Sequence, residues 1–244
     1  MRERLVRHAC VAFGDAPLPR MRSLPALEKL DLSGCILPAD AVSAVGNLTE
    51  LTELKLSGCG LSNIQPLSAL SKLSVLDLSN NSISDISALS GCTKLTDVNL
   101  QTNAVSTLSS LSGLNELVSL NISENAVASL EPLSACAKLE TLRADDNGLT
   151  DVQTLKNMTS LSVLTLSGNS ITDIAALSAC TAMTELDLSD NAVVSVDVIA
   201  QMKELKVLNI SHNQVKSLPT LSQDAHLQQL RASYNALSAL DVLA

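Results

Sequence analysis

Aliphatic residues recur along the chain in a fixed pattern that joins two different periods. Over residues 73–89 the pattern reads L-x-x-L-x-L-x-x-N-x-I-x-x-I-x-x-L. Leu76 and Leu78 flank Asp77 in its first half, and such alternation predicts a short β-strand with one apolar face. In the second half apolar residues come every three positions, which favours a 3₁₀ turn or an extended segment over a full α-helix. Each copy of the pattern therefore predicts one strand followed by a thin outer segment.

The pattern repeats every 22 residues and is marked by a regular asparagine. If the first leucine is position 1, the asparagine is position 9, in these residues: Asn81, Asn103, Asn125, Asn147, Asn169, Asn191, Asn213 and Asn235. Ten copies open at Leu27, Leu51, Leu73, Leu95, Leu117, Leu139, Leu161, Met183, Leu205 and Leu227. The first copy is longer, with 24 residues from Leu27 to Leu51. Self-similarity at this length, with these leucine offsets, is typical of a leucine-rich repeat.

Stacking of such units predicts the fold class, an α/β repeat solenoid. We expect a right-handed, curved leucine-rich-repeat solenoid with a parallel β-sheet on its concave face and short 3₁₀ or extended segments on its convex face. One unit cannot bury its own apolar edge, so each unit depends on its neighbours for a core. The asparagine amide can donate to and accept from backbone groups of its own loop and of the next, which predicts an asparagine ladder.

The repeats define the expected domain organisation. Residues 27–244 form one leucine-rich-repeat domain of about ten repeats, with no linker inside it. Residues 1–26 are a partial N-terminal cap or a segment of artificial origin, and Leu24 fits the later part of a preceding unit. The last unit stops midway at Ala244, so we expect that a C-terminal cap is missing and that the chain is a fragment of a longer protein.

Charge narrows the range of partners. The formal net charge is −9, from 16 Lys and Arg against 25 Asp and Glu. Nucleic-acid binding draws on clustered Lys and Arg, so we expect no nucleic acid partner. The chain has no stretch of about 18 apolar residues, so we expect no membrane span. The partner that remains is another protein, and the oligomeric state is left open.

Five of the six cysteines fall on repeat positions rather than in a disulfide framework. Cys35 and Cys59 replace the asparagine at position 9, and position 20 of alternate units holds Cys92, Cys136 and Cys180. Strands lie about 4.8 Å apart, so alternate units are separated by about 10 Å, beyond the roughly 7 Å that a disulfide spans between Cα atoms. We therefore expect free thiols at position 20. Only Cys35 and Cys59 are close enough to form a bridge, although both are expected to fill the interior.

No motif for catalysis, a cofactor or a metal is present. His8, His212 and His226 lie at unrelated repeat positions, without a nucleophile placed beside them by a motif. There is no C-x-x-C and no His/Cys spacing suited to zinc. Glycines that resemble a phosphate loop belong to position 8 of their units: Gly34, Gly58 and Gly168. We expect a protein that is not an enzyme and carries no cofactor or metal.

A binding function must then lie on the exposed strand side, at positions 3 and 5, and on its rim near position 8. The candidate protein-binding residues are Val75, Asp77, Asn99, Asn121, Glu124, Arg143, Asp145, Asp146, Val163, Asp187, Asp190, Asn209, His212, Arg231 and Tyr234. Arg143 with Asp145 and Asp146 forms the densest charged patch; the alternative is a solvated face that keeps the solenoid soluble. With no Trp, one Tyr and one Phe, we expect binding to be weak or electrostatic.

The outer turns carry a family resemblance. Residues 83–89 read I-S-D-I-S-A-L, residues 171–174 read I-T-D-I, and residues 65–67 and 131–133 form proline turns. Over about residues 27–243 the chain resembles the 22-residue repeats of bacterial internalins and related surface proteins, although it has fewer aromatic residues. The resemblance implies a protein-binding module without catalysis, on the cell surface or secreted as part of a longer protein.

The same repeat class is also similar to the regulatory subunit of type-one protein phosphatase and related intracellular scaffolds. The alternative function is therefore an intracellular scaffold or phosphatase-regulatory protein, and its location would be cytoplasmic. Free thiols favour this alternative because disulfides are rare in a reducing compartment, whereas the aspartate and proline turns favour the bacterial surface protein.

Overall fold

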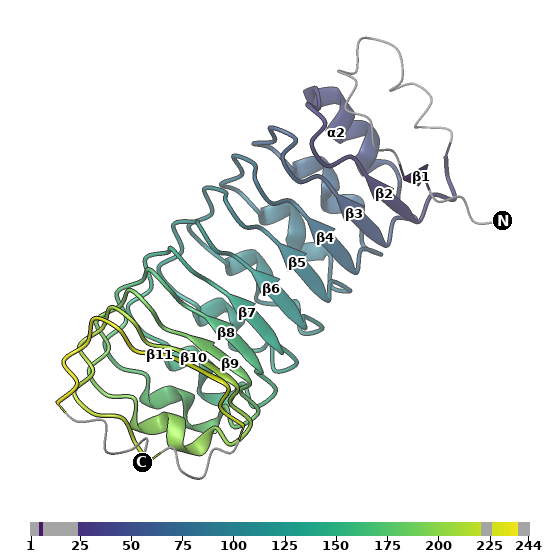
Figure 1. The fold of residues 1–244 in the computed structure, drawn as a ribbon. Coiled ribbons are helices and arrows are strands. Elements are labelled where there is room, and N and C mark those ends of the chain that lie inside the picture. The colour runs from purple at the N-terminus through teal and green to yellow at the C-terminus, as the bar shows by residue number, and fades with distance from the viewer. Residues whose placement is uncertain (1–4, 7–23, 221–225, 239–244) are drawn as a thin grey trace.

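The computed structural model describes residues 5–6, 24–220 and 226–238, and it shows an elongated solenoid with one parallel sheet along its length (Figure 1). Within these residues eleven strands follow one another in sequence order. They are β1 (Leu5–Val6), β2 (Lys29–Asp31), β3 (Glu53–Lys55), β4 (Val75–Asp77), β5 (Asp97–Asn99), β6 (Ser119–Asn121), β7 (Thr141–Arg143), β8 (Val163–Thr165), β9 (Glu185–Asp187), β10 (Val207–Asn209) and β11 (Gln229–Arg231). The predicted solenoid, with one strand from each unit in a parallel sheet, is confirmed.

The strand register places equal repeat positions side by side. Leu54 at position 4 lies opposite Leu76 in the next strand, and Leu76 lies opposite Val98. Positions 3 and 5 are likewise aligned, so each outward position forms a row that crosses the strands. β1 adds one strand before the ten counted units, with Leu5 opposite Leu30. The sheet therefore begins within the residues that precede the first counted repeat.

The outer side consists of short 3₁₀ helices, as the three-residue spacing predicts. They are η1 (Gln65–Ala69), η2 (Ser87–Gly91), η3 (Ser109–Leu111), η4 (Glu131–Leu133), η5 (Gln153–Asn157), η6 (Ala175–Ala179) and η7 (Asp197–Gln201). The prediction is wrong for the first unit, where α2 (Ala39–Gly46) is an α-helix of 8 residues. That unit is two residues longer than the others, and an α-helix fits more residues into the same axial length than a 3₁₀ helix.

In each of these seven 3₁₀ helices the first backbone N–H donates to a side-chain oxygen two residues earlier in the chain. Asp85 Oδ1 accepts a hydrogen bond from the Ser87 backbone N–H at 2.8 Å, and Asp173 does the same for Ala175 at 2.8 Å. The pKa of Asp85 is lowered mainly by the hydrogen bond from the Ser87 backbone and further by one from the Ser87 side chain. These turns use the aspartates of the I-S-D-I and I-T-D-I segments, so the residues that carry the family resemblance serve to end one extended segment and begin a helix.

One continuous apolar core runs between the sheet and the 3₁₀ helices from Leu27 to Leu218. The apolar positions of the unit that opens at Leu73 are all at most 2% exposed. Fully burying one such side chain contributes roughly 1.5–3 kcal/mol before chain entropy is subtracted. Neighbouring units share this core, so it supports the strand side along its length.

The asparagines at position 9 connect each unit to the one before it. Asn103 Oδ1 accepts a hydrogen bond from the Ile83 N–H at 2.9 Å. Its Nδ2 group donates to the carbonyl oxygens of Leu78 at 2.9 Å, Leu100 at 3.0 Å and Gln101 at 3.3 Å. The same exchange with the preceding unit recurs at the other asparagines of this position, for example at Asn213. One amide therefore satisfies backbone groups of two loops at once.

The five described cysteines are buried thiols, not disulfides. This confirms the prediction for Cys92, Cys136 and Cys180, whose pKa values are all raised by burial, that of Cys180 to about 11. At position 9, Cys59 Sγ donates to the Leu32 carbonyl oxygen of the preceding unit at 3.1 Å. Cys59 thus makes a weaker version of the contact that asparagine makes elsewhere at this position.

Candidate functional site

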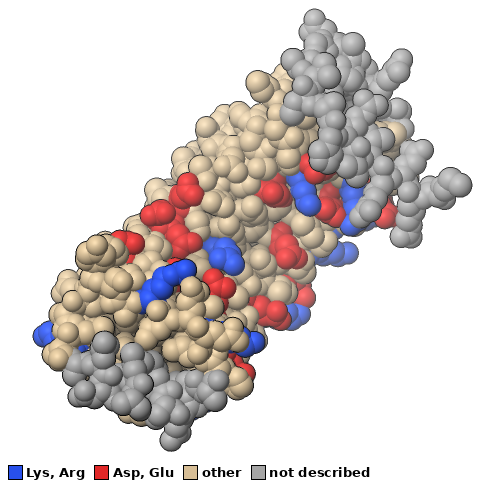
Figure 2. All heavy atoms as spheres, in the orientation of Figure 1, with Lys and Arg blue, Asp and Glu red and all other residues tan. Residues whose placement is uncertain are grey.

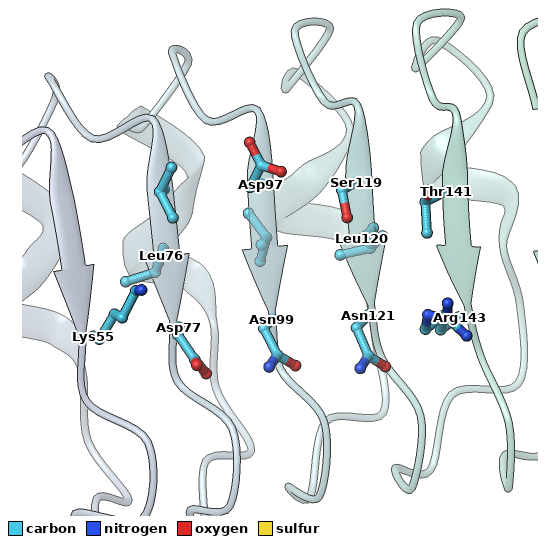
Figure 3. Close-up of a pocket in the computed structure, with 12 residues that line it drawn as sticks. Lys55, Leu76, Asp77, Asp97, Asn99, Ser119, Leu120, Asn121, Thr141 and Arg143 are labelled. Atoms are coloured by element: carbon cyan, nitrogen blue, oxygen red, sulfur yellow. The ribbon is translucent and has the colours of Figure 1, made fainter. Parts of the chain in front are cut away.

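The outward side chains of β2–β11, at repeat positions 3 and 5, form two parallel rows that we call the strand face. A groove of about 290 Å³ crosses this face over β3–β7 (Figure 3). Its position 5 row consists of Lys55, Asp77, Asn99, Asn121 and Arg143. Its position 3 row consists of Val75, Asp97, Ser119 and Thr141. The long side chains of Lys55 and Arg143 lie at opposite ends, and shorter side chains lie between them.

Two carboxylates and one guanidinium in this groove have no partner of opposite charge in the part of the chain that the structure describes. Lys55 Nζ lies 3.3 Å from Glu53 Oε1, and Lys29 Nζ lies 2.6 Å from Glu53 Oε2. The hydrogen bond from Lys29 is the main cause of a lowered pKa at Glu53. Among the described residues, Asp77, Asp97 and Arg143 form no ion pair within 4 Å. The charge of Lys55 is thus engaged, whereas the charges of these three residues face solvent.

The two asparagines of the groove are oriented by their own backbone. Asn99 Oδ1 accepts from the Gln101 N–H at 3.1 Å, and Asn121 Oδ1 accepts from the Ser123 N–H at 3.0 Å. Asn121 Nδ2 donates to Gln101 Oε1 at 3.2 Å. Within the described part of the chain, Asn99 Nδ2 makes no hydrogen bond. Each amide is held in place through its oxygen, and that of Asn99 keeps its N–H donors available.

The charged patch expected around Arg143 is divided by the structure. The Asp145 carboxylate accepts hydrogen bonds from Thr165 Oγ1 at 2.6 Å, from the Ser167 N–H at 2.8 Å and from Ser123 Oγ at 3.1 Å. It therefore connects three successive units. Arg143 instead belongs to the groove. Asp146 is exposed on the rim, where its carboxylate lies over Gly168 in the space that a Cβ would occupy.

The rim at position 8 consists of residues whose backbone adopts the left-handed conformation, with positive φ. The sequence analysis identified the rim but not this conformation. The non-glycine residues with φ between 50° and 57° are Asn80, Thr102, Glu124, Asp146, Asp190, His212 and Tyr234. Gly34, Gly58 and Gly168 complete this set at the same position. Glycine, asparagine and aspartate tolerate this conformation best, so their recurrence at position 8 was the available signal. The conformation directs a side chain outward at one edge of the strand face.

Two rim segments are organised by side-chain contacts. Gln101 Nε2 donates to Glu124 Oε1 at 2.9 Å, and Thr102 Oγ1 donates to Glu124 Oε2 at 3.1 Å. Further along, the rings of His212 and Tyr234 stack with centroids 4.2 Å apart. Tyr234 is 75% exposed. Asp190 Oδ1 lies 3.9 Å from His212 Nδ1.

The groove brings together only part of the predicted site. Five of the candidates line it: Val75, Asp77, Asn99, Asn121 and Arg143. Four lie on later strands outside it: Val163, Asp187, Asn209 and Arg231. The sequence analysis missed the groove residues Lys55, Asp97, Ser119 and Thr141. Three of these occupy position 3, where only valines had been selected, although polar residues there adjoin the polar row at position 5.

The surface in Figure 2 carries acidic side chains with basic side chains between them. In the described segments, no group of three His, Cys, Asp or Glu residues is arranged to hold a metal ion. Those segments also contain no helix with the length and apolar character needed to cross a membrane. The side chains that line the groove offer hydrogen-bonding groups and charges of both signs.

The family model described as leucine-rich repeats (2 copies) matches residues 49–91, 71–113, 137–179, 159–201 and 181–223. The chain belongs to the leucine-rich-repeat family. Its repeats are internalin-like, because a solved internalin (InlF) from Listeria monocytogenes is 30% identical with a TM-score of 0.88. That match covers 91% of this leucine-rich-repeat chain and 65% of the internalin. No curated protein sequence matches the chain.

Two more distant leucine-rich-repeat structures share the fold. The functional domain of InlJ from Listeria monocytogenes is 22% identical with a TM-score of 0.80, over 91% of this chain and 47% of that one. The plant peptide hormone receptor RGFR1, solved in complex with RGF2, is 24% identical with a TM-score of 0.77, over 89% of this chain and 38% of the receptor. This chain therefore spans about two thirds of the InlF chain and under half of the other two.

Proposed function

We propose that this chain is a non-catalytic protein-binding module that takes its partner on the strand face, and that it belongs to a larger bacterial surface protein. The observation that carries the proposal is the groove over β3–β7, in which Arg143 and the Nδ2 group of Asn99 have no partner among the described residues. Neither group is committed to the chain, so each can exchange water for an acceptor of a partner. A partner that supplies acceptors would satisfy both groups, whereas carboxylates such as Asp145 are already committed.

The surface location is supported by the internalin-like repeats, which are 30% identical to InlF. Peptide or protein binding is supported by the fold shared with RGFR1, which was solved in complex with RGF2. The candidate rim residues Glu124, Asp146, Asp190, His212 and Tyr234 border the strand face, and we include them as the edge of the proposed interface. An exposed tyrosine is the kind of residue that contributes strongly at protein interfaces.

An intracellular scaffold is the second candidate, and the cysteines favour it. All five described cysteines are thiols, which fits a reducing compartment. The binding role of the strand face is the same in both candidates, so they differ in compartment and partner.

The first experiment compares partner capture by three forms of the chain. Wild type, Arg143→Glu and Lys156→Glu are immobilised and exposed to host and bacterial extracts, and bound proteins are identified by mass spectrometry. Lys156 is the matched control because it is an exposed cation on η5, on the outer side. We expect a partner that is retained by Lys156→Glu and lost by Arg143→Glu. A partner retained equally by both variants would place the interface elsewhere, and a change in its mass after incubation would contradict a non-catalytic role.

A further inference from the structure

The groove has an uneven charge distribution along the solenoid axis. Asp77 on β4 and Asp97 on β5 lie diagonally across the register, since Val75 is opposite Asp97 and Asp77 is opposite Asn99. Arg143 lies two strands beyond β5, on β7 (Figure 3). One end of this stretch is therefore acidic and the other is basic, with Asn99 and Asn121 between them.

These charges are available to a ligand. Lys55 is opposite Asp77 in the register, yet its ammonium group lies 3.3 Å from Glu53 instead. Asp77 Oδ1 accepts hydrogen bonds from the Ser79 N–H at 3.0 Å and from Ser79 Oγ at 2.7 Å. Asp97 Oδ2 accepts one from Thr96 Oγ1 at 2.7 Å. These donors are neutral and each engages a single carboxylate oxygen, so both negative charges remain uncompensated. At the other end, the acid nearest in sequence to Arg143 is Asp145, whose carboxylate is occupied by three hydrogen-bond donors of the chain.

The separation of the charges matches an extended polypeptide. Neighbouring strands lie about 4.8 Å apart, so Arg143 is about 10 Å from the level of β5 and about 14 Å from that of β4. A polypeptide advances about 3.3 Å per residue when extended. Three or four residues of a segment that runs across the strands would thus cover the distance between the carboxylates and the guanidinium.

We propose that the groove selects an extended polypeptide segment with a basic side chain and a carboxylate about three or four residues apart. The basic group lies over Asp77 and Asp97, and the carboxylate accepts hydrogen bonds from the Arg143 guanidinium. The Nδ2 group of Asn99 donates to a backbone carbonyl of the segment between these two contacts. The proposal rests on the proposed protein-binding function and specifies which segment the strand face takes.

A ligand with one sign of charge fits less well. A polyanion would meet Asp77 and Asp97, and a uniformly basic segment would meet Arg143, so each would place like charges in contact. The carboxylate can come from an aspartate or glutamate side chain or from a chain terminus. Both sources share the same chemistry at Arg143, and peptides with free or amidated C-termini distinguish them.

The test uses the full chain and fluorescein-labelled octapeptides of Gly, Ser and Ala that carry one Arg and one Glu. The separation of Arg and Glu is varied from one to six residues, and affinity is measured by fluorescence anisotropy at low salt. We expect the peptides with separations of three and four to bind about fivefold more tightly than those with one or six, the size of effect that one partly exposed charge pair supports. Equal affinity at all separations would overturn the proposal.

The groove variant gives a second, independent result. Arg143→Glu should reverse the preference, so that peptides with two Arg residues at the same separation become the tighter ligands. Lys156→Glu, on the outer side, should keep the wild-type preference. Unchanged urea midpoints in both variants establish that folding is intact. An Arg143→Glu variant that still prefers the Arg and Glu peptides would show that Arg143 does not select the carboxylate.

The two proposals fail in distinguishable ways. In one case, wild type captures a protein that Arg143→Glu does not, but the peptides bind equally at all separations. The binding function would then stand, and the charge-spacing rule would be wrong. In the opposite case, the peptides show the expected preference but the Arg143→Glu variant captures the protein partner as well as wild type does. That result would confirm the charge-spacing rule for the groove and place the natural interface elsewhere.

Discussion

Asparagine occupies position 9, in what we call the loop column, in eight units and position 5, on the strand face, in three units, and Asn103 and Asn99 show how the two positions differ. In one unit, Asn103 makes one accepted and three donated hydrogen bonds to backbone groups of two units. Asn99, four residues earlier, accepts one bond and donates none within the described residues. Positions that join neighbouring units are saturated by the chain itself. On the strand face, Asn121 and Asn209 each donate to one neighbouring side chain. The Nδ2 group of Asn99 retains its donors within the described residues, and it is the kind of group that a partner can use.

The largest expected effect is a difference between these two asparagines when both are replaced by alanine. Asn103→Ala leaves the Ile83 N–H and the carbonyl groups of two loops without their side-chain partner, and should lower the free energy of unfolding by about 2–3 kcal/mol. Asn99→Ala should change it by less than about 0.5 kcal/mol, as surface substitutions do. Urea denaturation of both variants measures the difference. Equal midpoints would remove the distinction between the two regions.

The second expected effect is a loss of stability at high pH, which arises from the buried thiols of the core and not from the exposed strand face. Burial raises the pKa of Cys92 and Cys136, and that of Cys180 to about 11, whereas an unfolded thiol titrates near 8.5. The folded state therefore holds its protons longer. The stability from this source is complete below about pH 8 and is lost as the pH rises toward 11, by roughly 2 kcal/mol at pH 10.5 for Cys180.

Cys180→Ala provides the control for this pH effect. The variant should be less stable than wild type at pH 7.5 because it creates a small cavity. Its stability should then fall less steeply between pH 8.5 and 10.5, measured by urea denaturation under reducing conditions. The hypothesis of a buried, protonated thiol would be wrong if both proteins lost stability in parallel over this interval.

The repeat made some features predictable from sequence and hid others. The strands, the 3₁₀ helices and the thiols at position 20 follow from periodic contacts, because a residue one period away is always its neighbour in space. The α-helix of the first unit required only two additional residues, and the pattern of apolar positions did not reveal it. Asp145 was selected as part of a charged patch, but its role depends on hydroxyl groups of two other units, Ser123 and Thr165. The groove depends on which of its charges remain unpaired, and that is set by side-chain geometry rather than by the period.

The rim supplies a third, smaller test, because there the chain accepts local strain at exposed positions. Thr102 has a β-branched side chain at φ 54°, a conformation that costs an L-residue roughly 1–2 kcal/mol. Thr102→Gly should relieve this strain while it removes one exposed hydrogen bond to Glu124. Glycine also makes the unfolded chain more flexible, which offsets roughly 0.5–1 kcal/mol of the relief. We expect a net gain of about 0.5 kcal/mol in the free energy of unfolding, read from the urea midpoint. A loss of stability would mean that the contact with Glu124 outweighs the strain.

The smallest expected effect tests why the loop column stabilises the solenoid. Its amides could matter because they are partly buried, or simply because they connect neighbouring units. Lys138 Nζ and Glu116 Oε2 lie 2.6 Å apart and join successive units across one period, as the asparagines do. Both side chains are more than half exposed, at 58% and 54%. Exposed ion pairs of this kind contribute little because water competes for each charge. Lys138→Gln should therefore shift the free energy of unfolding by under about 0.5 kcal/mol, and 1 M salt should abolish most of that shift. A loss comparable with that of Asn103→Ala would show that any bridge between units stabilises the solenoid, and the partial burial of the amide would no longer explain why asparagine recurs at position 9.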